Sequence, residues 1–188
     1  GFTAVTTQQL WKDHPEKVCA FTEEFAGKNP KTVKAILKAL HLASVHLDKL
    51  PNRQAAAEVI SRPTYINCPP DIILERLMGK YEYGDGRVEQ DPNYMTFSSR
   101  GANYPHQIYA KWFLTQFRRW GLVKDHPDYL AVAKQINQID LYKQAASAMK
   151  VSLPASDLRS SKLIDGVTWD GRDPARYADA FKVKVVPA

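Results

Sequence analysis

The stretch NYPHQIYAKWFLTQFRRWG, from Asn103 to Gly121, contains two tryptophans, two phenylalanines, two tyrosines and three residues of lysine or arginine. Pro105 and Gly121 bracket about four turns of helix, because proline is favoured in the first turn and glycine just after the last. Five aromatic residues fall on one side of a wheel with about 3.6 residues per turn: Tyr109, Trp112, Phe113, Phe117 and Trp120. The stretch therefore predicts an amphipathic helix with a wide apolar face.

The basic residues of this helix are separated from the aromatic ones. Lys111 and Arg118 fall nearly opposite the aromatic face, and Arg119 lies on its flank. A nucleic-acid site would interleave aromatic and basic residues on one exposed face, so nucleic acid is the weakest interpretation. A helix on a membrane or partner surface would segregate them, and this stays an alternative. Because other amphipathic helices precede and follow the stretch, we expect the aromatic face to be core and Lys111 and Arg118 to face solvent.

The composition is that of an ordinary globular protein. The chain has 188 residues, of which 44% are hydrophobic and 24% charged, enough for one domain with a substantial core. No apolar run approaches the roughly 20 residues of a membrane helix. The chain begins without methionine and without a basic signal-peptide region, so we expect a fragment or a processed chain.

The net charge of +6 favours anionic partners. Because the charge is spread along the chain, it favours weak steering of anions rather than a nucleic-acid site. The two cysteines, Cys19 and Cys68, belong to no CxxC or Cys/His cluster, so we expect packing residues and no zinc site.

Hydrophobic periodicity predicts roughly five to seven helices against two or three weak strands. We expect a strand over Gly1–Thr7, then a helix that begins at Pro15, carries Glu16 and Lys17 in its first turn, and ends at Gly27. The clearest helix lies within Asn29–Pro51, with one apolar stripe: Val33, Ile36, Leu37, Leu40, Ala43 and Leu47.

Further helices are expected within 52–62, within 69–79 with an end at Gly79, and once or twice within 126–151. Tight turns are expected at Tyr83–Arg87, Asp165–Gly166 and Asp170–Gly171, and a terminal strand at 182–186. The Gly-Asp-Gly of the first turn lacks the spacing of an EF-hand, so we assign it to turn chemistry and not to calcium.

No motif of nucleophilic, nucleotide or zinc-dependent catalysis occurs, so we expect no enzyme, no cofactor and no metal. Glu23 and Glu24 are adjacent and point about 100° apart on a helix, which indicates a charged surface and not a catalytic pair. His41 and His46 are five residues apart, so they do not share a helix face on which to bind a metal.

Lys17 is the one candidate binding residue. In the first turn of the expected helix, its ammonium would add a full charge and three donors to free backbone N–H groups, an arrangement that attracts anions. A solvent-facing helix lysine is the alternative from spacing alone.

The order of GFTAVTTQQLWKDHPEKVCAF, AILKALHLAS, YGDGR, NYPHQIYAKWFLTQFRRWG and IDGVTWD resembles the C-terminal part of the nitrate- and bicarbonate-binding proteins of ABC transporters. The resemblance runs over essentially the whole chain, and WFLTQFRRWG and YGDGR are its most specific parts. It implies the α/β class: residues 1–188 would be a single region, the helix-rich C-terminal portion of a two-lobed type II periplasmic-binding-protein fold.

The resemblance also implies a function. Such proteins hold a small oxyanion without covalent chemistry and deliver it to a membrane permease, so the implied location is periplasmic, with membrane anchoring at an N-terminus outside this chain. Lys17 matches a ligand position, where lysine suits nitrate or nitrite and glutamate would suit bicarbonate with a metal ion. The N-terminal lobe of the family is missing from the chain, and half a cleft would hold an anion poorly.

Three alternative functions and one alternative ligand stay open. A cytoplasmic nitrate/nitrite sensor and a regulatory domain fused to a transporter ATPase would share the architecture and differ upstream of this chain. An enzyme of the thiamine-precursor-synthesis type would need a catalytic cysteine or histidine, for which Cys19 is the only cysteine near Lys17. Bicarbonate is the alternative ligand.

Overall fold

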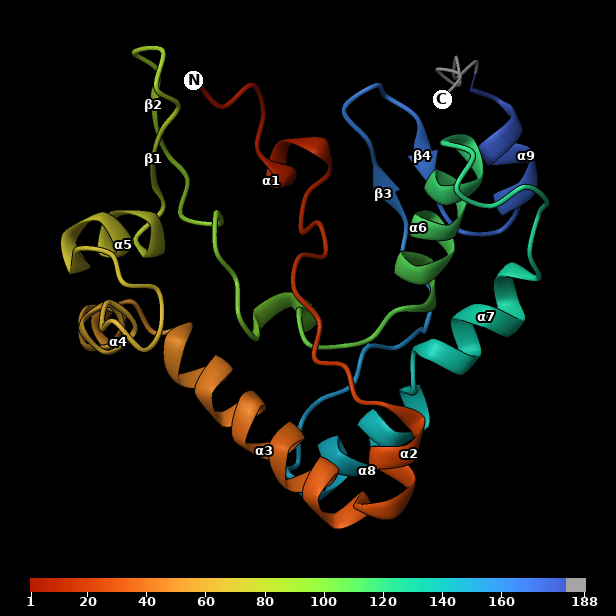
Figure 1. Cartoon of the computed structure of the whole chain (residues 1–188), viewed down its shortest axis with the longest axis horizontal. Helices are drawn as coiled ribbons and strands as arrows, with labels where there is room; N and C mark the ends of the chain where they lie inside the picture. The colour runs from red at the N-terminus through yellow and green to blue at the C-terminus, as the bar shows by residue number, and fades with distance from the viewer. Residues whose placement is uncertain (182–188) are drawn as a thin grey trace. The chain divides into compact units, whose positions relative to one another are not determined.

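The computed structural model describes residues 1–181, which divide into two compact units, one over Gly1–Asn103 and one from Tyr104 onward. Each unit is mainly helical and carries one two-stranded antiparallel sheet (Figure 1). The expectation of a helix-rich chain with few, short strands is confirmed for these residues. None of their helices is both long and apolar enough to cross a bilayer. That residues 1–188 form a single region stays a prediction.

The first unit contains one long helix, several short helices and one hairpin. Its elements are α1 (Thr7–Leu10), α2 (Glu23–Lys28), α3 (Pro30–Leu47), the 3-10 turn η1 (Leu50–Asn52), α4 (Arg53–Ile60), α5 (Pro70–Leu77), β1 (Lys80–Glu82), β2 (Val88–Gln90) and the 3-10 turn η2 (Ser99–Gly101). The core lies between α4 and α5, where Ala57 packs with Ile73 and Leu77. Cys68 packs against this cluster as a partly buried side chain, as expected, whereas Cys19 is exposed and the prediction that it packs is wrong.

Local signals predicted α5 and the tight turn at Tyr83–Arg87 correctly, but not the two strands that this turn joins. Proline opens α5, and Gly79 follows it with a φ of 85°. A Cβ on Gly79 would lie 2.1 Å from the carbonyl oxygen of Asp91, so only glycine fits this position. Gly84 and Gly86 also have positive φ, in the turn that pairs Glu82 with Val88.

The prediction for residues 1–22 is wrong in two places. Gly1–Thr6 form no strand, because a single backbone bond, from Thr3 N–H to the oxygen of Tyr83, joins them to the hairpin. The helix expected from Pro15 begins only at Glu23. Thr22 is its N-cap, and the Thr22 hydroxyl accepts a hydrogen bond from Phe25 N–H at 3.1 Å.

The helix α3 follows its prediction closely, from Pro30 as the first helical residue to Leu47. Its apolar stripe is only partly covered, since Val33 is fully buried while Leu40 is 45% exposed. Glu23 and Glu24, in the first turn of α2, are exposed as expected of a charged surface.

Within the described residues, the second unit contains four helices and one hairpin. Its elements are α6 (Gln107–Arg119), α7 (Tyr129–Ile136), α8 (Ile139–Ala148), β3 (Ser161–Lys162), β4 (Thr168–Trp169) and α9 (Pro174–Asp179). α6 contacts both α7 and α9, and Trp169 in β4 donates an indole hydrogen bond to the oxygen of Ile108 at 3.1 Å. The helices within 126–151 and the two turns are as predicted; the strand expected at 182–186 lies outside the described residues.

The helix α6 exists as predicted, but its buried face is a different one. Ile108, Lys111 and Thr115 are buried, whereas Phe113 and Phe117 are nearly 40% exposed and Trp120 is 55% exposed. The Lys111 ammonium donates to the oxygen of Gly171 at 3.1 Å, so the prediction that Lys111 faces solvent is wrong. Gly171 comes so close to this face that a Cβ on it would lie 2.9 Å from Cγ2 of Ile108, a tertiary approach that periodicity cannot foresee. Arg118 is half-buried, so the prediction that it faces solvent is also wrong.

Candidate functional site

Lys17 lies in an irregular segment between α1 and α2 and is exposed. Because α2 begins six residues later, the ammonium does not stand at a helix N-terminus, and that argument for anion binding is wrong. Within residues 1–181 the side chain has no hydrogen-bond or ion-pair partner. All three of its N–H donors are therefore available to an anion.

The segment just before Lys17 is held in place, although it has no regular structure. The Trp11 side chain is buried, and the ring of His14 packs against it with ring centroids 4.7 Å apart. Burial lowers the pKa of His14, which favours the neutral ring at this position. The Nδ1–H of His14 donates to the oxygen of Pro15 at 2.6 Å. The Thr7 hydroxyl donates to the Glu16 carboxylate, so contacts reach the residue next to Lys17.

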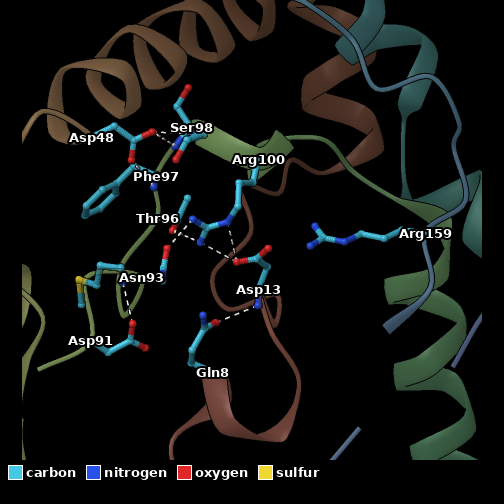
Figure 2. A network of polar contacts seen from close by, with 12 residues as sticks. Gln8, Asp13, Asp48, Asp91, Asn93, Thr96, Phe97, Ser98, Arg100 and Arg159 are labelled. Carbon is cyan, nitrogen blue, oxygen red and sulfur yellow. Dashed lines mark hydrogen bonds and ion pairs between the residues drawn. The ribbon is translucent and has the colours of Figure 1, made fainter. Parts of the chain in front are cut away.

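Asp13 attaches this segment to Gln8 and, by an ion pair, to Arg100 (Figure 2). Its backbone N–H donates to the side-chain oxygen of Gln8 at 2.8 Å. Its carboxylate oxygen Oδ1 accepts from both Nε and Nη2 of Arg100, at 2.9 Å and 2.6 Å. The two residues are 87 positions apart in the chain. The ion pair thus joins the segment carrying Lys17 to η2.

The Arg100 guanidinium makes two further hydrogen bonds besides those to Asp13. Nη1 donates to the side-chain oxygen of Asn93 at 2.8 Å, and Nη2 donates to the hydroxyl of Thr96 at 2.6 Å. A planar guanidinium with fixed donor directions can join several acceptors in one geometry, which an ammonium on a flexible stem cannot. Figure 2 shows Asp13, Asn93 and Thr96 gathered around it.

Asp48, the C-cap of α3, holds the loop that leads to Arg100. Its carboxylate accepts from the backbone N–H groups of Phe97, Ser98 and Ser99, at 2.8 Å, 2.9 Å and 2.5 Å (Figure 2). Burial of the carboxyl raises the pKa of Asp48, but these hydrogen bonds outweigh it, and the net effect is a pKa below its ordinary value. The loop is therefore fixed to a long helix.

The sequence offered no signal for Asp13, Asp48 or Arg100, because their partners are distant in the chain. The structure also does not bring His41 and His46 into a metal site: among residues 1–181, no three His, Cys, Asp or Glu side chains lie where they could share an ion. Lys17 remains the candidate for direct contact with a ligand, and the Asp13–Arg100 ion pair lies four positions before it in the chain.

The second unit has a shallow pocket with cationic residues of its own, lined by Leu158, Arg159, Ser160, Asp170 and Arg172. Arg172 lies 3.5 Å from the Asp170 carboxylate and its side chain is 82% exposed. A carboxylate among the arginines weakens the attraction for an anion, so this pocket is the weaker candidate.

Comparison with known proteins adds an independent finding. Residues 1–61 match the model of the NMT1-like family. The whole chain is 36% identical over 192 residues to the nitrate/nitrite binding protein NrtA of Synechococcus elongatus and covers 43% of it. The chain also matches the crystal structure of the periplasmic nitrate-binding protein NrtA of Synechocystis, with a TM-score of 0.91 at 33% identity, over 97% of this chain and 49% of that one.

A further relative belongs to a different component of a transport system. The nitrate import ATP-binding protein NrtC of Synechocystis is 27% identical over 184 residues, which cover 97% of this chain and 28% of that protein. These matches confirm the resemblance to nitrate/nitrite-binding proteins and the assignment to a helix-rich portion of their α/β fold. The chain spans less than half the length of the NrtA relative.

Proposed function

We propose that this chain is part of a solute-binding protein that captures nitrate or nitrite for an ABC transporter. The observation that carries the proposal is the match to nitrate/nitrite binding proteins over the whole chain. Capture would be non-covalent, with no catalytic residue, cofactor or metal. The permease of the transporter and the rest of the same protein would be its partners. The likeness to a periplasmic protein supports a periplasmic location, and a membrane anchor outside this chain is part of the proposal.

We infer that Lys17 contacts the anion. Its exposure and its three unused donors support this role, because a monovalent oxyanion needs charge-assisted hydrogen bonds to replace its hydration. A lysine at this position also argues against bicarbonate held through a metal ion, for which a carboxylate would be the suitable residue.

A regulatory domain of a transport ATPase is the second candidate. The similarity to NrtC over nearly the whole chain favours it specifically. A cytoplasmic sensor of the same architecture is a third. The three differ in what the gene encodes upstream: a signal peptide with a lipobox cysteine, an ATPase domain, or neither.

Isothermal titration of the full-length protein with nitrate, nitrite and bicarbonate, the last with and without calcium, tests the proposal. We expect nitrate or nitrite to bind, and Lys17→Glu to remove binding. The matched control is Lys34→Glu on an exposed face of α3, which makes the same charge change and should leave the affinity within about twofold. Binding of bicarbonate alone, or binding untouched by Lys17→Glu, would contradict the proposal.

A further inference from the structure

We propose that Arg100 is a positioning residue that sets where the Lys17 ammonium stands, and so determines anion affinity without touching the anion. The inference rests on the proposed function of Lys17. Lys17 lies on an irregular segment, where no helix or strand fixes its position. A flexible segment would have to be ordered on binding, which weakens affinity.

The backbone at both ends of the Asp13–Arg100 pair is unusual. Among residues 1–181, four residues other than glycine have positive φ, and two of them are Asp13, at 61°, and Arg100, at 57°. A left-handed conformation is unfavourable for residues with a Cβ and persists where the surroundings determine it strongly. Here the four hydrogen bonds of the Arg100 guanidinium hold both residues in this conformation.

The contacts form one path from a rigid element to the segment. Asp48 at the end of α3 fixes the backbone of residues 97–99, and Arg100 follows directly. Arg100 then fixes Asp13, four residues before Lys17. Two further contacts hold the residues between Asp13 and Lys17: His14 packs on Trp11, and the Thr7 hydroxyl binds Glu16. Loss of the guanidinium would therefore release the segment while leaving the ammonium chemically intact.

A double-mutant cycle in the full-length protein tests the inference with nitrate as the probe. We expect Arg100→Gln to raise the Kd for nitrate about tenfold, and Arg62→Gln, at an exposed arginine, to change it less than about twofold. In a Lys17→Gln background, Arg100→Gln should have less than about a twofold effect, because it acts through Lys17. An equal effect in both backgrounds, or wild-type affinity in Arg100→Gln, would overturn the inference.

Asp13→Asn provides a second variant in case Arg100→Gln folds poorly. Asparagine tolerates positive φ, so this change removes the charge and keeps the backbone conformation. It should reproduce the loss of affinity, whereas Arg100→Lys should restore little, since an ammonium cannot replace the planar fork. Full rescue by lysine would show that charge alone matters and would contradict positioning.

A readout without ligand separates this inference from the proposed function. Cys19 is exposed two residues after Lys17, so a spin label on it reports motion of the segment in a Cys68→Ser protein. We expect a more mobile label in Arg100→Gln than in Arg62→Gln. Equal mobility would refute positioning even if nitrate binds, and increased mobility would support it even if nitrate does not bind.

Discussion

Replacement of Asp48 by asparagine should destabilise the fold, because the Asp48 carboxylate accepts three backbone hydrogen bonds from the loop at 97–99. Hydrogen bonds to a charged acceptor are stronger than neutral ones, by roughly 1 kcal/mol each. The amide oxygen of asparagine can still accept, while its NH2 group would face backbone donors. We therefore expect the free energy of unfolding to fall by about 2–3 kcal/mol near neutral pH.

The pH dependence of this loss gives a sharper test. Because the pKa of Asp48 in the folded state lies below its ordinary value of 3.8, the carboxylate stabilises the fold above that value. Its contribution is lost as the pH falls below 3.8 and the group becomes protonated. The difference between wild type and Asp48→Asn should therefore be constant from neutral pH to about pH 5 and shrink toward pH 3.

Urea unfolding of the full-length protein, followed by tryptophan fluorescence, measures this difference. The control is Asp125→Asn, which removes the same charge from an exposed loop position and should cost less than about 0.5 kcal/mol. A loss in Asp48→Asn no larger than in the control would refute the assignment of Asp48 as the support of this loop. A loss that does not change with pH would refute the role of its ionised form.

Three further predictions concern other parts of the chain. Gly79→Ala should lower the free energy of unfolding by more than about 2 kcal/mol, because the new Cβ would meet the Asp91 oxygen. Gly86→Ala, with open space around it, should lower it by about 1 kcal/mol because of its positive φ. Thermal unfolding compares the two variants, and equal losses of stability would contradict the contact with Asp91. Ile108→Ala should cost about 2–5 kcal/mol in the same assay, and Phe117→Ala clearly less; the reverse order would mean that the aromatic face of α6 is the covered one. Cys19 should react with a thiol reagent much faster than Cys68, because Cys19 is exposed and Cys68 packs against the α4–α5 core. The single variants Cys19→Ser and Cys68→Ser measure the two rates separately, and similar rates would contradict the partial burial of Cys68.

Local sequence signals were sufficient where the chain contacts itself over short distances. Proline and glycine mark the ends of α5 and the turn of the hairpin correctly, since they act through their own backbone angles. The long periodic runs of α3 and α6 are helices for the same local reason. The resemblance to nitrate/nitrite-binding proteins was also available from the sequence alone.

The segment around Lys17 could not be predicted from such signals. Pro15 and Glu16 are typical of a helix start, yet Asp13 is bound to Arg100 and Glu16 to Thr7, and no helix forms until Glu23. Contacts over long separations outweigh a helix propensity worth only a few tenths of a kcal/mol per residue. The sequence identified the lysine as a candidate, but not the way in which its segment is held.

For α6, the sequence predicts the helix, whereas the tertiary structure decides which of its faces is buried. Periodicity determined that one side of this helix is apolar and that Lys111 lies opposite. Only tertiary packing decided that Gly171 lies against Ile108 and Lys111, and that Thr115 on the same side of α6 is buried with them. A lysine can be buried when its long apolar stem packs and its ammonium finds a carbonyl, and where such a carbonyl lies depends on residues some 60 positions away.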